Sequence, residues 1–357
     1  MVCGGRSVRL LDRGTGNAEW TYTVGNPIER ALNRQVVAAS LGGAAFDDQH
    51  VAVNVTGGVN ELVLLDANAG GKVVWQKKLA ISPVWAPVIW QDRVVVTTVN
   101  SVDVFDVATG EQVIHLKTDR PRKRAEALDD GRLLVGGMTS LACIDLTSGR
   151  TLWSRPYRLY YNNAVSNDGV VQIGNRCCYV SYTTDRKVFC LDVEGGEELW
   201  SVTIGGAQDR PFALRLAGDD IYVLVMTTRG RDRSVRVHQL SVADGKQGWQ
   251  SPALEPKEPD ATFLATARDW RVGREQIVLL VDLWQMKQVG RAFTNTVREP
   301  MLYALDRQTG KVVQEIEIPG ETKPPAVIRP TNLLAADDML WVTYWDHMIG
   351  LRGAKQP

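Results

Sequence analysis

Cysteine and histidine are the residue types in this sequence that could hold a metal ion or carry redox chemistry. The chain has five cysteines and four histidines. No Cys-x-x-Cys pair occurs, and the histidines are isolated from one another along the chain. The sequence therefore lacks a ligand set with the spacing of a zinc site. We therefore predict no metal site. The number of cysteines is odd and their spacing is irregular, so we predict no disulfide framework.

Cys177 and Cys178 are adjacent, and an adjacent pair could in principle form a reactive disulfide. Neighbouring Cα atoms lie about 3.8 Å apart, which is below the usual range for a disulfide, so this bond would require a strained peptide. Residues 176–182 read Arg-Cys-Cys-Tyr-Val-Ser-Tyr, which is typical of an ordinary β-strand.

Two segments concentrate positive charge. Residues 117–124 contain five basic residues in eight, and residues 229–233 form a second basic segment. A local cluster of this kind can form an electrostatic docking patch for an acidic partner. The alternative is that the basic side chains are only solvated. The candidate partner-binding residues are Arg120, Arg122, Lys123 and Arg124.

Composition excludes several classes of protein. The 357 residues include 41 Lys and Arg against 41 Asp and Glu, and this zero net charge argues against a dedicated nucleic-acid binder. With 44% hydrophobic and 23% charged residues, the chain has the composition of an ordinary globular protein. No apolar run approaches the ~20 residues that a membrane-spanning helix needs. We therefore expect no transmembrane segment, no nucleic-acid partner and a monomer.

The first residues carry no recognisable export signal. No apolar segment precedes Cys3, so this residue does not match a lipid-attachment cysteine. Taken literally, this start predicts a cytoplasmic protein. The alternative is that an upstream segment with an export signal precedes Met1.

An internal repeat organises the whole chain. Each copy contains a short apolar strand that ends in Asp, a turn that ends in Gly, and a second strand that carries Trp. An Asp at a strand end can accept hydrogen bonds from amides of the turn, and Gly supplies the positive φ that the turn needs. Seven copies and a final half-copy lie near residues 8–20, 62–75, 102–114, 141–153, 188–200, 237–249, 302–314 and 347–353. The repeat residues are Asp12, Gly16, Trp20, Asp66, Trp75, Asp106, Gly110, Asp145, Gly149, Trp153, Asp192, Gly196, Trp200, Gly245, Trp249, Asp306 and Gly310.

The repeat predicts a β-propeller. Most copies follow another hairpin with its own turn, so each unit comprises four short antiparallel strands. Four strands in roughly 40–50 residues make one propeller blade. We predict an all-β fold in which residues 1–357 form one eight-bladed domain whose first blade is incomplete at the amino terminus. Two long intervals are expected to contain extra loops, at residues 26–35 and 286–297.

Five of the eleven tryptophans occupy one repeat position, on the outermost strand of a blade. A buried Trp removes about 150–250 Å² from water, which at about 25 cal/mol per Å² stabilises by on the order of 4–6 kcal/mol as an upper estimate. The regular position indicates that these rings hold neighbouring blades together. The alternative is a series of exposed stacking platforms for sugars or bases.

These residues resemble the tryptophan-docking motif Ala-x-Asp-x-x-x-Gly-x-x-x-Trp of pyrroloquinoline-quinone-type propellers. Residues 304–311 read Ala-Leu-Asp-Arg-Gln-Thr-Gly-Lys and match its first part, with Gln314 in place of Trp. The resemblance covers the whole chain. In length and number of motifs, the sequence is most similar to the propeller lipoproteins of the outer-membrane β-barrel assembly machinery.

Resemblance to the assembly branch implies a non-enzymatic scaffold in the periplasm or cell envelope that binds another protein, such as an envelope assembly component. In that family an arginine-bearing loop between blades contacts the barrel-inserting partner. The basic loop at residues 117–124 is comparable in place, although its residues do not reproduce the family's motif. We predict this scaffold function, with no catalytic residue and no cofactor.

The quinoprotein dehydrogenase branch is the alternative. It would imply pyrroloquinoline quinone with calcium, and Cys177 and Cys178 would correspond to the adjacent-cysteine disulfide that stacks on the quinone. The chain is shorter than those enzymes, and we could assign no Asp, Glu and Asn set to calcium and base roles. A second alternative is a propeller that senses a small ligand in its central channel.

Overall fold

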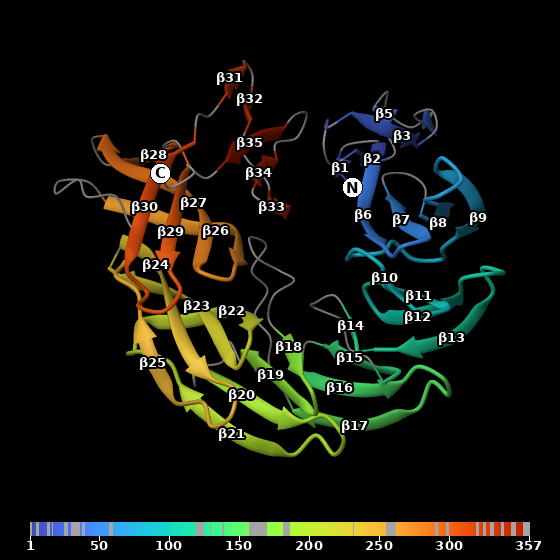
Figure 1. Ribbon diagram of the computed structural model, residues 1–357, viewed down its shortest axis with the longest axis horizontal. Coiled ribbons are helices and arrows are strands. Elements are labelled where there is room, and N and C mark those ends of the chain that lie inside the picture. Colours follow the sequence, from blue (N-terminus) through green and yellow to red (C-terminus); the bar gives the residue numbers. More distant parts are fainter. Residues whose placement is uncertain are drawn as a thin grey trace. The chain divides into compact units, whose positions relative to one another are not determined.

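The fold is that of a computed structural model, and its regular elements in the described residues are all β-strands (Figure 1). The chain divides into two compact units, Met1–Leu159 and Tyr160–Pro357. The single eight-bladed domain stays a prediction. The structure describes residues 2–4, 7–12, 15, 17–24, 28–29, 36–37, 40–56, 60–118, 125–128, 130–137, 139–156, 170–180, 186–230, 232–254, 262–289, 292–297, 300–318, 321–323, 326–328, 332–336, 339–343 and 348–352.

The first unit contains a series of antiparallel sheets built from consecutive strands, which we number as blades 1 to 4. Blade 1 comprises β1 (Val2–Gly4), β2 (Ser7–Leu11) and β3 (Ala18–Thr23); blade 2 comprises β6 (Ser40–Phe46), β7 (His50–Thr56), β8 (Glu61–Asp66) and β9 (Lys72–Lys78). Blade 3 comprises β10 (Val88–Trp90), β11 (Arg93–Thr97), β12 (Ser101–Asp106) and β13 (Gln112–Lys117); blade 4 comprises β14 (Glu126–Ala127), β15 (Arg132–Gly136), β16 (Ser140–Asp145) and β17 (Thr151–Pro156). Between blades 1 and 2, β4 (Ile28–Glu29) pairs with β5 (Val36–Val37).

The second unit continues the pattern with blades 5 to 7 and a final three-stranded sheet. Blade 5 comprises β18 (Val170–Ile173), β19 (Arg176–Val180), β20 (Lys187–Asp192) and β21 (Glu198–Thr203); blade 6 comprises β22 (Asp209–Ala217), β23 (Asp220–Arg229), β24 (Asp232–Ser241) and β25 (Gln247–Gln250). Blade 7 comprises β26 (Thr262–Val272), β27 (Gln276–Val289), β29 (Met301–Asp306) and β30 (Val312–Glu317), with β28 (Ala292–Val297) paired to β27. The remaining strands are β31 (Glu321–Lys323), β32 (Ala326–Ile328), β33 (Asn332–Ala336), β34 (Met339–Thr343) and β35 (Met348–Arg352).

One predicted loop is wrong. Residues 286–297 form a hairpin in which β27 continues past blade 7 and pairs with β28, closing with Val289 opposite Ala292. Apolar and polar residues do not alternate regularly in this segment, so the sequence did not indicate that the strand continues. Blades 6 and 7 are further joined by a parallel bridge between Arg233 and Leu264.

The repeat turn is built by its Asp and its Gly. In blade 3, Oδ1 of Asp106 accepts a hydrogen bond of 2.9 Å from the amide of Thr109. This backbone hydrogen bond holds the pKa of Asp106 below its usual value. Gly110 has φ of 67° and donates its amide to the carbonyl of Asp106 at 2.8 Å. The equivalent aspartates that accept turn amides are Asp12, Asp66, Asp145, Asp192 and Asp306; Gly16 lies outside the described residues.

Four of the five repeat tryptophans dock on the turn of the next blade. Trp75 Nε1 donates a hydrogen bond to the carbonyl of Val107 at 2.6 Å, and its ring covers Gly110, where a Cβ atom would lie 2.7 Å from the ring. The absence of a side chain at Gly110 therefore allows this close approach. The same pairing joins Trp20 to Gly71, Trp200 to Gly245 and Trp249 to Gly310, while Trp153 is also buried.

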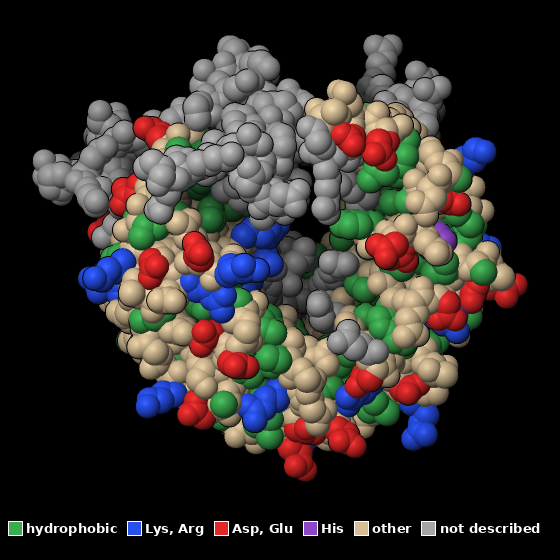
Figure 2. All heavy atoms as spheres, in the orientation of Figure 1, with side chains coloured by type: hydrophobic (Ala, Val, Ile, Leu, Met, Phe, Trp, Pro, Cys, Tyr) green, Lys and Arg blue, Asp and Glu red, His purple; other side chains and the backbone are tan. Residues whose placement is uncertain are grey.

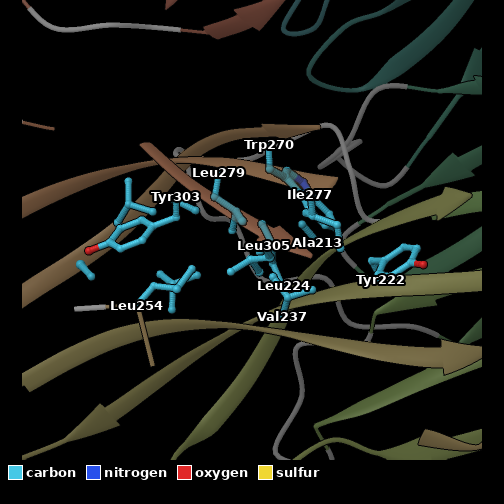
Figure 3. Close-up of a cluster of buried hydrophobic side chains, with 14 of the residues drawn as sticks. Ala213, Tyr222, Leu224, Val237, Leu254, Trp270, Ile277, Leu279, Tyr303 and Leu305 are labelled. Atoms are coloured by element: carbon cyan, nitrogen blue, oxygen red, sulfur yellow. The ribbon is translucent and has the colours of Figure 1, made fainter. Parts of the chain in front are cut away.

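The hydrophobic core is divided into clusters that lie between neighbouring blades. Trp75 and Leu79 of blade 2 pack with Val94, Val96 and Phe105 of blade 3. Figure 3 shows the corresponding cluster of the second unit, where buried side chains of β23, β26, β27 and β29 meet. Within each unit, blade faces are therefore buried by stacking on neighbouring blades.

Candidate functional site

Cys177 and Cys178 lie in the middle of β19, both with no exposed surface. Successive residues of a strand point to opposite faces of the sheet, so their thiols are separated. Neither forms a disulfide. The arrangement does not present the two sulfur atoms together to a ligand.

The thiol partner of Cys178 is Cys190 on the adjacent strand β20. The two residues are directly opposed in the register of the sheet, and their Sγ atoms are 2.8 Å apart. The hydrogen bond with Cys190, followed by burial, raises the pKa of the Cys178 thiol. A buried thiol with a raised pKa is a poor nucleophile.

The four candidate docking residues Arg120, Arg122, Lys123 and Arg124 lie outside the described residues. The structure describes the two ends of their segment. Thr118, just after β13, donates its amide to the carbonyl of Asn100 at 2.9 Å, and Ala125, just before β14, is fully buried. The basic segment thus connects the outermost strand of blade 3 to the innermost strand of blade 4, and its docking role stays a prediction. The described part of the second basic segment closes the β23–β24 hairpin, with Arg229 opposite Asp232.

One repeat position shows a departure that the sequence reasoning missed. The position lies three places before the motif Asp, or before its equivalent Ser241. In blades 3 and 6 it is a buried titratable residue, Asp103 (8% exposed) or His238 (2% exposed). In both blades a glutamine of the outermost strand, Gln112 or Gln247, bonds to it. The equivalent residues elsewhere are the hydrophobic Val63, Ala142, Phe189 and Tyr303, and in blade 1 the exposed Arg9.

Asp103 is the centre of a polar network on β12 and β13. Its Oδ1 atom accepts hydrogen bonds from Gln112 Nε2 at 2.8 Å and from His115 Nδ1 at 2.6 Å. Its Oδ2 atom accepts a hydrogen bond of 2.9 Å from the hydroxyl of Ser101, which in turn contacts the hydroxyl of Thr98 at 2.7 Å. Both carboxylate oxygens are therefore occupied by donors of this chain.

This network borders a cavity of about 540 Å³ between blades 2 and 3, which we call the junction groove. One wall is the segment 78–81, which begins at the last residue of β9, and the other wall comes from β12 and β13. Apolar side chains of Leu79, Ile81 and Phe105 line it, together with the polar Asp103 and His115. The volume lies within the range of about 300–1,000 Å³ that is typical of small-molecule sites.

The corresponding position of blade 6 is closed. His238 is almost fully buried, and its Nδ1 atom has no hydrogen-bond partner. Burial lowers the pKa of His238, against the opposing charge of Asp209. Asp209 itself accepts hydrogen bonds from the hydroxyl of Thr227 at 2.5 Å and the amide of Gly206 at 2.7 Å.

Basic side chains gather on the visible face over β22 and β26 (Figure 2). Asp269 of β26 accepts a hydrogen bond from Arg271 Nη1 at 2.8 Å and forms an ion pair with Arg215 of β22 at 3.6 Å. Its second oxygen accepts the amide of Leu333 at 2.8 Å. The guanidinium of Arg215 also lies 5.6 Å from the ring centroid of Trp270. This network ties β22, β26 and β33 together, which is a structural role.

The described residues contain no group of three or more His, Cys, Asp or Glu side chains placed to hold a metal ion. In the same part of the chain, no helix is long and apolar enough to cross a membrane.

Antiparallel four-stranded sheets that dock on one another through a repeat tryptophan define a β-propeller, which confirms the predicted fold class; the number of blades stays a prediction. The sequence profile of the family described as outer membrane protein assembly factor BamB matches residues 4–251 and 137–323. The chain therefore belongs to the BamB family. No curated protein sequence matches it.

Solved structures share the fold at low sequence identity. BamB from Moraxella catarrhalis is 15% identical with a TM-score of 0.58, and the similarity covers 98% of this chain and 99% of that one. Hsv2 from Kluyveromyces lactis is 8% identical with a TM-score of 0.57, covering 86% and 91%. The quinohemoprotein alcohol dehydrogenase ADHIIG from Pseudomonas putida is 10% identical with a TM-score of 0.55, covering 87% of this chain and 64% of the enzyme.

Proposed function

We propose that this protein is a non-enzymatic scaffold of the bacterial cell envelope that binds another protein during outer-membrane protein assembly. The observation that carries the proposal is the family match, which extends over most of the chain. The fold supports it, because a propeller is a rigid frame whose connecting loops can vary to form partner surfaces. The basic segment 117–124 is the proposed docking loop.

The docking loop is tested by charge reversal. Arg122, Lys123 and Arg124 are changed together to Glu, and capture of solubilised outer-membrane assembly components by the purified, immobilised protein is measured. We expect capture to be lost, because the attraction to an acidic partner becomes repulsion. The matched control reverses three exposed lysines of repeat turns and should retain capture: Lys72, Lys246 and Lys311. Equal capture by both triple variants would show that the basic segment is only solvated.

The enzymatic alternative has a separate test. Pyrroloquinoline quinone and calcium are added to the purified protein, and the melting temperature and dye reduction with alcohols and sugars are followed. A bound cofactor stabilises the folded state by mass action, so a rise of about one degree or more together with dye reduction would overturn the scaffold proposal. The separation of Cys177 and Cys178 onto opposite faces of β19 favours the scaffold.

A further inference from the structure

We propose that the junction groove between blades 2 and 3 binds a small organic carboxylate with an apolar body, independently of the docking loop. The groove combines a cavity of about 540 Å³ with a polar network at one side and apolar side chains around it. The proposal goes beyond the scaffold function, because it concerns a small ligand and not a partner protein.

The outward-facing ionisable side chains of the groove are the basic ones, His115 and Lys78. Asp103 has both oxygens engaged, by His115 and Gln112 on Oδ1 and by Ser101 on Oδ2, so it is not available to a cationic ligand. Because a carboxylate only accepts, Nδ1 of His115 donates to Asp103, and Nε2 is left for a second contact, which is donated to an anion when the ring carries a proton on both nitrogens. The His115 side chain is 53% exposed. Lys78 lines the other wall and is also exposed. The outward-facing ionisable groups that line the groove thus favour an anion.

Asp103 also acts as a positioning residue for His115. A carboxylate at 2.6 Å from Nδ1 fixes the orientation of the imidazole. The carboxylate itself accepts a hydrogen bond from the buried Ser101 hydroxyl, which in turn contacts the buried Thr98 hydroxyl, so the imidazole is attached to a rigid support. Preorganised donors of this kind cost little to engage a ligand.

The remainder of the groove is apolar. Of the apolar residues that line it, Leu79 and Phe105 are buried and Ile81 is half-buried. Val113 of the outermost strand is 47% exposed at the groove. A ligand with a hydrocarbon or aromatic body could cover these side chains while its carboxylate meets His115 and Lys78.

The repeat itself argues that this arrangement is more than blade packing. Four other blades use a hydrophobic residue where blade 3 has Asp103, so a carboxylate is not needed to stack blades. Departures from a consistent local pattern are expected at functional sites. In blade 6 the equivalent His238 is closed off from solvent, whereas Asp103 borders an open cavity.

The test uses three probes that share one aromatic body: 3-phenylpropionate, its neutral amide 3-phenylpropanamide and the cation 3-phenylpropylamine. Binding to the full purified chain is measured by ligand-observed NMR titration. We expect the acid to bind, and Lys78→Gln and His115→Gln each to weaken it by about tenfold, which corresponds to the loss of one charge-assisted hydrogen bond. Lys72→Gln, at the start of the same strand β9, should bind the acid unchanged.

Three results would overturn the proposal: equal binding of the acid and the amide, unchanged affinity in both variants, or no binding of any carboxylate probe. Circular dichroism and an unchanged melting temperature verify that the variants are folded. The peptide acetyl-Ala-Ala-Leu with a free carboxyl terminus distinguishes two sources of the carboxylate. Tighter binding of the peptide indicates the end of a polypeptide, and tighter binding of 3-phenylpropionate indicates a free acid. Failure of this test leaves the docking-loop proposal unaffected, because that proposal is measured by partner capture.

Discussion

The turn between β8 and β9 contains two consecutive glycines with different surroundings, and together they test why the repeat requires Gly. Both have positive φ, 71° at Gly70 and 74° at Gly71. A Cβ atom at Gly70 would meet nothing within 4 Å, whereas one at Gly71 would lie 2.6 Å from Cε3 of Trp20. Alanine at the first position therefore adds only backbone strain, and alanine at the second adds strain and a collision with the docked ring.

The expected magnitudes follow from these two contributions. A residue with a side chain in the left-handed region costs about 1–2 kcal/mol, and overpacking of a well-packed site adds about 1–3 kcal/mol. We expect Gly70→Ala to lower the free energy of unfolding by about 1–2 kcal/mol and Gly71→Ala by about 2–5 kcal/mol. The ring of Trp20 cannot move away freely, because its Nε1 atom donates to the carbonyl of Ala67 at 3.0 Å.

The measurement is urea denaturation followed by circular dichroism, with the denaturant slope compared between variants. A double-mutant cycle with Trp20→Ala isolates the contact between the ring and the turn. Without the ring, the cost of Gly71→Ala should fall to that of Gly70→Ala. The reasoning is refuted if the two alanine variants are equally stable, or if Gly71→Ala keeps its larger cost when Trp20 is absent.

Three further predictions concern other blades. Because burial lowers the pKa of His238, the imidazole binds a proton more readily in the unfolded chain than in the folded one. The free energy of unfolding should therefore fall as pH drops below ~6.5. Denaturation of His238→Gln at a series of pH values should show a weaker pH dependence, and an unchanged pH dependence would contradict this reasoning. Cys178 and Cys190 should stay thiols when the folded protein is exposed to oxidised glutathione, because both are fully buried and the pKa of Cys178 is raised. Mass spectrometry after unfolding and alkylation checks this, and a disulfide between the two would contradict it. Ile114→Trp should restore a docking ring beside blade 4 and raise the free energy of unfolding by about 1 kcal/mol; a lower urea midpoint would show that this turn cannot accept the ring.

The fold was predictable because the repeat encodes local constraints. An Asp that accepts turn amides, a Gly with positive φ and a Trp on the following strand act within a few residues, and their recurrence marks each blade. The same residues also form the contact between blades. The ring of Trp75 packs on Gly110 in the turn that follows Asp106, so the tryptophan of one repeat requires the glycine of the next. The β27–β28 hairpin was missed because it is an insertion without a counterpart in the other copies.

The junction groove was not predictable in the same way. Asp103 and His115 are twelve residues apart in sequence and are brought together by the pairing register of β12 and β13. The opposite wall, residues 78–81, belongs to the preceding repeat. One signal was present in the sequence: Asp103 occupies a repeat position that is hydrophobic in four other blades. This difference becomes visible only after the copies are aligned by their turns.

The cysteines illustrate why register matters more than adjacency in a protein of this kind. Cys177 and Cys178 are consecutive, yet the period-two geometry of a strand directs their side chains to opposite faces of the sheet. The closest sulfur to Cys178 belongs to Cys190, at 2.8 Å across the neighbouring strand. Chemistry in a repeat β-fold is therefore best sought by aligning the blades and comparing cross-strand partners, and this comparison is what separates Asp103 and His115 from the residues that only stack one blade on the next.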